Sequence, residues 1–224
     1  MNTPSLCATI VAALLLPMAP SSADEEGAAP SEGMKVKITR DLESVEIMHG
    51  GAPVAVQRVQ DTANTMKPSF TKTSRVCPPF CVQPMKLAPG VETIGEIQML
   101  DYLKRASDGD AGILVIDSRT VPWVQRGTIP GTVSIPYKKL SLRTGDEDEI
   151  LSLMEDQFGA LRSGEFWDFS NARTLVLFCN GMWCGQAPTN IKQLLRMGYP
   201  AHKLKWYRGG MQAWETLGLT TVKP

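Results

Sequence analysis

Two short, uninterrupted apolar runs constrain the fold of this chain most strongly. They are Ile113–Ile116 (ILVI) and Thr174–Phe178 (TLVLF). Apolar runs of this length, without alternating polar residues, are typical of strands that are buried on both faces of a parallel sheet. Segments with helical periodicity lie at Asp146–Leu161 and Ala187–Met197. Strands that alternate with helices predict an α/β protein whose parallel sheet is covered by helices on both faces.

Shorter patterns extend this architecture in both directions along the chain. Thr93 and Glu96 have capping-box spacing and stand before a helical apolar stripe. Thr132–Ile135 and Lys205–Tyr207 have strand character, and a last helix is expected through Trp214–Leu217. These patterns predict an α/β domain over residues 93–224.

The sequence predicts a small β-rich, proline-rich extension over residues 24–92. Met34–Ile38, Val45–Met48 and Pro53–Val59 have strand character. His49-Gly50-Gly51 is a turn signal between the last two, so we expect them to form a hairpin. Residues 61–90 are rich in proline and lack apolar periodicity, which indicates an irregular arm.

The first 23 residues are typical of a signal peptide. Ala8–Leu16 is a short apolar run, and Ser21-Ser22-Ala23 is a small-residue cleavage pattern. A membrane-spanning helix needs about 20 apolar residues, and this run has roughly half that length. We therefore expect an exported protein, periplasmic or secreted, with no membrane segment in its mature form. The alternative is an apolar tail without a targeting role, because no Lys or Arg precedes the run.

The overall charge gives no sign of a polyanionic partner. The chain has 23 basic and 23 acidic residues and no basic stripe, so we expect neither a nucleic-acid nor an anionic-membrane partner. The two histidines, His49 and His202, are isolated from the cysteines, and no Cys-x-x-Cys-His sequence occurs. We therefore expect no metal and no other cofactor.

The mature chain would keep four of the five cysteines. Cys77 and Cys81 are close together in the proline-rich segment, and an exported protein favours a local structural disulfide between them. The alternatives are redox exchange with the Cys179 loop, or a site for a soft metal ion together with Met85. Cys179 and Cys184 lie near the second apolar run.

Cys179 directly follows the second predicted buried strand, and a short loop and a helix follow it. The carboxyl ends of parallel strands are where α/β folds bind ligands. Loop amides and a helix N-terminus facing the sulfur would lower the pKa of the thiol and favour an anion beside it. Cys179 is therefore our candidate nucleophile, and the alternative is a small buried residue at a strand end.

Four segments, taken in order, resemble the rhodanese family. They are Val115–Arg119 (VIDSR), Gly127–Pro136 (GTIPGTVSIP, with Thr128 in the usual His place), Cys179-Asn180-Gly181 with Gly185-Gln186, and Tyr207–Trp214 (YRGGMQAW). The resemblance implies a rhodanese fold and sulfur transfer through a persulfide on Cys179. It also implies a small sulfur donor and a thiol or cyanide-like acceptor, or a protein acceptor.

The chain departs from the family pattern in the loop after Cys179. Members that use thiosulfate commonly carry Arg or Lys there, and this loop has none. Its residues are Asn180, Gly181, Met182, Trp183, Cys184 and Gly185. We therefore expect weak activity with thiosulfate, and Arg126 or Arg208 are candidates to replace the missing cation. Gly185 stands where related phosphatases have Arg, which argues against phosphatase chemistry.

Cys184 has two interpretations. As a resolving thiol it would attack a Cys179 persulfide, release sulfide and leave a disulfide. Alternatively it is a small residue that fills the loop. Two other functions therefore remain beside sulfur transfer: a thiol–disulfide redox or sulfide-sensing protein that uses Cys179 and Cys184, and a non-catalytic rhodanese-fold binding module.

Overall fold

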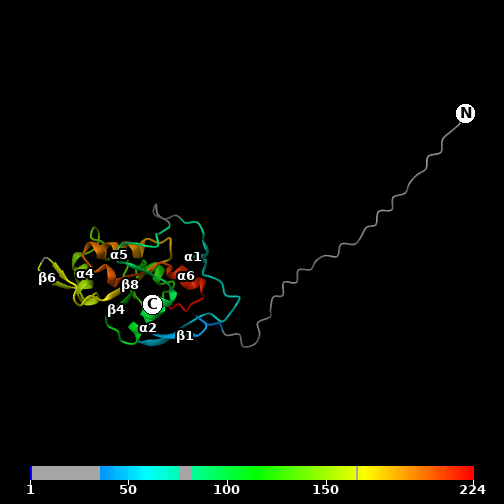
Figure 1. Ribbon diagram of the computed structural model, residues 1–224, viewed down its shortest axis with the longest axis horizontal. Coiled ribbons are helices and arrows are strands. Elements are labelled where there is room, and N and C mark those ends of the chain that lie inside the picture. The colour runs from blue at the N-terminus through cyan, green and yellow to red at the C-terminus, as the bar shows by residue number, and fades with distance from the viewer. Residues whose placement is uncertain (2–35, 76–81, 165) are drawn as a thin grey trace. The chain divides into compact units, whose positions relative to one another are not determined.

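A five-stranded parallel sheet forms the centre of the fold (Figure 1). Its strand order is β3-β9-β8-β4-β5, and every neighbouring pair is parallel. The two apolar runs form neighbouring strands, β4 and β8, in the interior of the sheet. The strands are β3 (Glu92–Ile94), β4 (Ile113–Asp117), β5 (Val133–Ser134), β8 (Thr174–Phe178) and β9 (Leu204–Tyr207).

The computed structural model describes Met1 and residues 36–75, 82–164 and 166–224. Its helices and strands all belong to the unit Lys35–Pro224. The expected signal peptide at residues 1–23, apart from Met1, and the expected Cys77–Cys81 disulfide lie outside the described residues. Within the described ranges no helix has the length and hydropathy to cross a bilayer.

Both faces of the sheet are buried because side chains of a strand alternate between them. In β8, Leu175 and Leu177 pack in one hydrophobic core, and Val176 and Phe178 pack in the other. The first core is covered by α4, the following π-helix and α5, and the second by α2 and α6. These helices are α2 (Glu96–Ser107), α4 (Glu147–Ser152), the π-helix (Leu153–Gln157), α5 (Gln186–Arg196) and α6 (Gly210–Thr216). The predicted fold class is confirmed.

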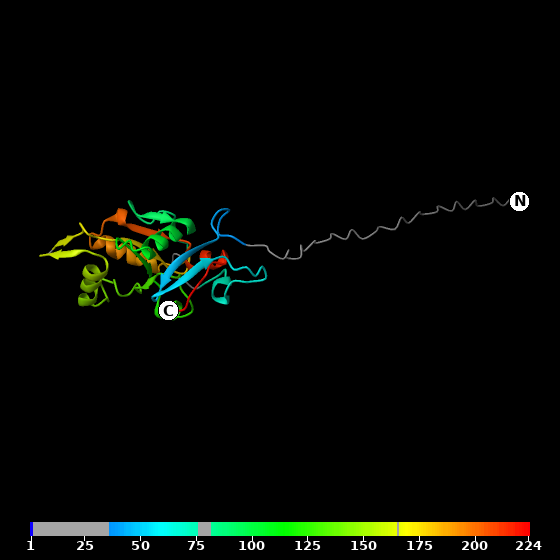
Figure 2. The same cartoon turned by 90° about the horizontal axis from the view of Figure 1, so that it is seen from below.

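The predicted N-terminal hairpin is also present. Strands β1 (Ser44–His49) and β2 (Ala52–Gln57) pair in antiparallel fashion around Gly50-Gly51. Both glycines have positive φ, 58° and 82°, as a tight turn between two strands requires. The hairpin lies beside α2 (Figures 1 and 2) and buries its apolar side chains in the second core.

Local structure differs from the sequence prediction in three places. Residues 92–94 form strand β3, and Gly95 is the N-cap of α2, where its N–H donates to the Gln98 side chain. The expected helix Asp146–Leu161 is a short α4 followed by the π-helix. The chain then forms an antiparallel hairpin that projects from one end of the domain (Figure 2). Residues 36–38, the described part of Met34–Ile38, are not a strand. The remaining elements are β6 (Leu161–Ser163), β7 (Phe166–Asp168), α1 (Pro68–Thr71), α3 (Val121–Val124) and a 3-10 turn (Ala201–Lys203).

Candidate functional site

Cys179 and Cys184 lie together at the carboxyl edge of the sheet. β8 ends at Phe178 and α5 begins at Gln186, so the loop of residues 179–185 connects the central strand to the N-terminus of a helix. Both cysteines are free thiols. Cys179 is 2% exposed and Cys184 is 5% exposed, so the loop encloses both sulfurs.

Backbone amides of the loop and of the first turn of α5 interact with both sulfurs. The N–H groups of Ala187 and Gly181 hydrogen-bond to the Cys179 sulfur. The Cys179 Sγ also donates to the carbonyl oxygen of Cys184, at 3.4 Å. A hydrogen bond of 2.9 Å from the Cys184 N–H to the Gly181 carbonyl closes the loop. This arrangement can hold negative charge on sulfur.

The two thiols influence each other, and their pKa values shift in opposite directions. Burial raises the pKa of the Cys179 thiol well above its ordinary value, and the neighbouring Cys184 raises it further. The pKa of Cys184 is lowered because Cys179 hydrogen-bonds to it, and the Gln186 and Asn180 amides and the charge of Arg119 add to this lowering. These surroundings therefore favour negative charge on Cys184 over negative charge on Cys179. The sequence interpretation expected a lowered pKa at Cys179, where burial outweighs the amides.

The C-terminal Gly-Gly segment holds the loop from α6. The N–H groups of Met211 and Gln212 donate to the carbonyls of Cys179 and Asn180, at 3.0 and 2.9 Å. Gly210 has φ +54°, and a Cβ there would lie 2.3 Å from the Cys179 carbonyl oxygen. Only glycine allows the backbone to approach the loop this closely. The similarity of this segment to the family signature thus has a direct structural cause.

Asp117 and Arg119 form a buried ion pair near the loop. Arg119 donates to both carboxylate oxygens of Asp117, from Nε at 2.9 Å and from Nη2 at 2.6 Å, and both side chains are 1% exposed. The hydroxyl of Thr128 donates to the same carboxylate at 2.7 Å. Thr128, in the family's His place, therefore still supplies a hydrogen bond to Asp117. The Arg119 charge contributes to the low pKa of Cys184.

The irregular arm of residues 61–90 contacts the loop through Gln83. The Gln83 N–H donates to the Met182 carbonyl oxygen at 2.9 Å. Arg208 in turn donates from Nε and Nη2 to the Gln83 carbonyl, at 3.2 and 2.8 Å. One of the two candidate cations thus lies against the segment that covers the loop. The other, Arg126, is exposed and lies over the ring of Trp123, 5.0 Å from its centroid.

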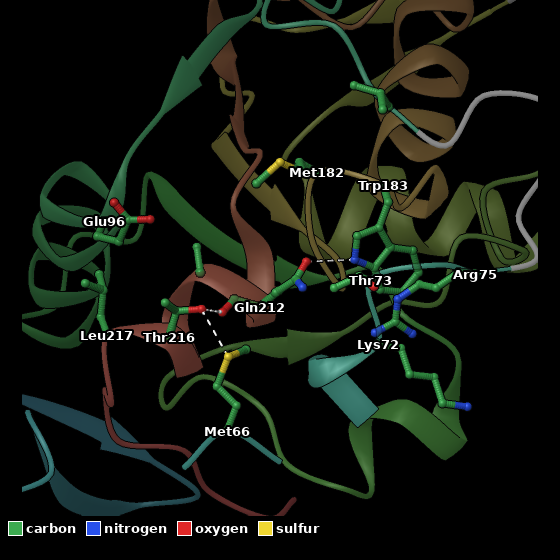
Figure 3. A pocket seen from close by; sticks show the side chains of 12 residues that line it. Met66, Lys72, Thr73, Arg75, Glu96, Met182, Trp183, Gln212, Thr216 and Leu217 are labelled. Carbon is green, nitrogen blue, oxygen red and sulfur yellow. Dashed lines mark hydrogen bonds between the residues drawn. The ribbon is translucent and has the colours of Figure 1, made fainter. Parts of the chain in front are cut away.

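Arg75 is a cation at the loop that the sequence interpretation missed. Its guanidinium stacks over the Trp183 ring at 4.1 Å from the centroid, and Nη2 donates to the Ser69 carbonyl. The indole N–H of Trp183 donates to the Gln212 side chain at 2.9 Å (Figure 3). Arg75 lies in an irregular segment without periodicity, so no sequence pattern relates it to a loop about a hundred residues later.

A pocket of about 680 Å³ opens beside the loop. Met182 and Trp183 of the loop form part of its wall, and Figure 3 shows Arg75 and Lys72 of the arm on the same side as Trp183. Glu96 lies on the opposite side (Figure 3). The side chain of Met182 is 46% exposed. The two outward-facing residues of the loop therefore contact a pocket, while the two sulfurs are enclosed behind them.

These features define an α/β protein with a pair of thiols at the carboxyl edge of a parallel sheet. The family model of the rhodanese-like domain matches residues 99–217. The chain belongs to the rhodanese-like domain family. The resemblance inferred from the sequence is thereby confirmed.

Several solved structures are similar to part of the chain. BH2092 protein from Bacillus halodurans is 19% identical, with a TM-score of 0.40, over 59% of this chain and 77% of that one. A human single-domain sulfurtransferase is 19% identical, with a TM-score of 0.38, over 58% and 96%. The As-Sb reductase from Leishmania major is 19% identical, with a TM-score of 0.40, over 57% and 79%. None of the curated proteins that were compared matches the chain.

Proposed function

We propose that this protein is a sulfurtransferase that carries sulfur as a persulfide on Cys179. The observation that carries the proposal is the position of the Cys179 sulfur, at the end of β8 and within hydrogen-bonding distance of the Ala187 and Gly181 amides. A persulfide is an anion near neutral pH, and amides at a helix N-terminus stabilise an anion. The family of the chain supports the same chemistry.

The thiol pair suggests how the nucleophile forms. When Cys184 is ionised, it accepts the proton of Cys179. The Cys179 thiolate then attacks the outer sulfur of the donor. The donor's S–S bond breaks, and its leaving group (sulfite, when the donor is thiosulfate) departs with the bonding electrons. A thiol or cyanide acceptor attacks the outer sulfur of the resulting persulfide and regenerates Cys179.

A specific observation also favours a second candidate function. Cys179 and Cys184 are free, and the Cys179 Sγ lies 3.4 Å from the Cys184 carbonyl oxygen, an arrangement suited to thiol–disulfide exchange. For both candidates we propose that the mature protein acts outside the cytoplasm, periplasmic or secreted. The signal-peptide pattern in residues 1–23 supports that proposal.

We expect slow thiosulfate:cyanide sulfurtransferase activity, measured as thiocyanate. The loop itself has no cationic side chain, and the nearby cations Arg75 and Arg208 are engaged elsewhere, the first over the Trp183 ring and the second with the Gln83 carbonyl. A lost charge-assisted hydrogen bond costs about 1.5–3 kcal/mol, or roughly ten- to a hundredfold in rate. Met182→Arg should raise kcat/KM for thiosulfate about tenfold. Met85→Arg, at an exposed methionine outside the loop, is the matched control and should leave it unchanged. If neither thiosulfate nor an organic thiosulfonate yields thiocyanate with wild type or either variant, the proposed function is wrong.

A further inference from the structure

Cys184 has the surroundings of a reactive thiol and not of a packing residue. A cysteine buried in apolar surroundings normally has a raised pKa. The pKa of Cys184 is instead lowered by Cys179, by the amides of Gln186 and Asn180 and by the charge of Arg119, and its Sγ donates to the Gln186 side chain at 3.8 Å. A sulfur carrier needs one nucleophile, which is Cys179. The surroundings that stabilise negative charge on Cys184 therefore indicate a second reactive thiol.

Contact and burial together favour a reaction between the two cysteines. The Cys179 Sγ already lies 3.4 Å from the Cys184 carbonyl oxygen, and the loop is closed by the Cys184–Gly181 backbone hydrogen bond. An external acceptor must reach a sulfur that is 2% exposed, beneath the Gln83 segment. Well-oriented intramolecular groups can reach effective concentrations of about 10⁵ M or more, far above any dissolved acceptor. Cys184 is therefore the acceptor with the best access to a Cys179 persulfide.

We propose that Cys184 reduces the Cys179 persulfide and that the protein releases sulfide. The inference rests on the proposed function, because it begins from the persulfide. Cys184, which took the proton of Cys179, passes that proton to the outer sulfur of the persulfide and becomes a thiolate. The Cys184 thiolate attacks the inner sulfur, Cys179 Sγ, and the bond between the inner and outer sulfurs breaks. The outer sulfur of the protonated persulfide leaves as HS⁻ with the bonding electrons, and a Cys179–Cys184 disulfide remains.

The cycle then requires a dithiol reductant as its second substrate. One thiolate of that dithiol attacks the disulfide, forms a mixed disulfide and releases one protein cysteine. The second thiolate of the dithiol attacks the dithiol sulfur of the mixed disulfide and releases the other cysteine, so both protein cysteines return to the reduced form. The dithiol supplies the two electrons that convert sulfane sulfur to sulfide. A reaction that regenerates dithiols must therefore operate in the same compartment, and in the absence of an external acceptor the product is sulfide.

The test loads the full-length protein with benzenethiosulfonate, removes the donor, and follows sulfide release and the Cys179 peptide by mass spectrometry. No acceptor is added. Wild type should release one sulfide per persulfide and accumulate a dithiothreitol-reversible Cys179–Cys184 crosslink. Cys184→Ser should hold its persulfide at least about tenfold longer and form no crosslink. Cys184→Ala is run in parallel, and the double variant Cys77→Ser/Cys81→Ser is the control that should behave like wild type.

The outcomes separate the inference from the proposed function. If Cys179 carries a persulfide that decays equally fast in wild type and both Cys184 variants, without a crosslink, Cys184 is a packing residue and the inference is overturned. If sulfide release stops only in the Cys77/Cys81 double variant, the resolving thiol lies elsewhere, and the inference is again overturned. If no persulfide forms on Cys179 in any of the proteins, the proposed function fails as well.

Discussion

Replacing Cys179 with serine is expected to abolish sulfur transfer. A serine hydroxyl remains protonated near neutral pH and forms no persulfide, so the site loses both its nucleophile and its carrier. Thiocyanate formation from thiosulfate or an organic thiosulfonate should fall on the order of a thousandfold or more, to the uncatalysed background. The measurement is the initial rate in the presence of cyanide.

The substitution should leave the fold intact, because serine is smaller than cysteine and the Cys179 carbonyl that accepts the Met211 N–H is retained. Near-ultraviolet circular dichroism checks this, and the Cys77→Ser/Cys81→Ser variant, with both active-site cysteines present, is the activity control. Turnover that survives in folded Cys179→Ser protein would show that the reactive sulfur lies elsewhere.

Replacing Arg119 with methionine is expected to lower the free energy of unfolding by about 3–5 kcal/mol. The change removes the guanidinium from the buried Asp117 carboxylate and leaves the Thr128 hydroxyl as its side-chain donor among the residues that the structure describes. A buried charge without its counter-charge is far more costly than the net contribution of the pair itself. Urea denaturation near pH 7 measures the effect.

Arg126→Met is the matched control for this prediction. Arg126 is exposed and its structural contact is the stacking on Trp123, so its loss should cost no more than about 1 kcal/mol. Equal effects of the two substitutions would contradict the structural role that we assign to the Asp117–Arg119 pair.

The central sheet could be predicted from the sequence because its strongest signal is local. Ile113–Ile116 and Thr174–Phe178 are apolar at successive positions, which only strands covered on both faces require. They are the neighbouring strands β4 and β8. The start of α2 was misplaced because Thr93 fits both a helix cap and an edge strand. Pairing with β9, which decides between them, involves residues more than a hundred positions later.

The sequence predicted the two cysteines of the candidate site but not the residues of the N-terminal arm that contact the loop. Cys179 and Cys184 follow β8 directly, so their proximity is a local consequence of a strand–loop–helix unit. Gln83 and Arg75, which contact Met182 and Trp183, lie in an arm without periodicity, and such long-range contacts leave no local pattern. The directions of the two thiol pKa shifts could not be predicted from the sequence either, because they depend on burial and on the Arg119 charge.

Mapping the sulfur on the active-site loop tests the central claim most directly. The Cys184→Ser protein, in which the persulfide should persist, is exposed to benzenethiosulfonate, digested without reductant and analysed by mass spectrometry. The account predicts the added mass of one sulfur atom on Cys179, removed by cyanide with formation of thiocyanate and absent from Cys179→Ser. An unmodified Cys179 in the Cys184→Ser protein, with added sulfur on Cys184 in the wild-type protein, would contradict it.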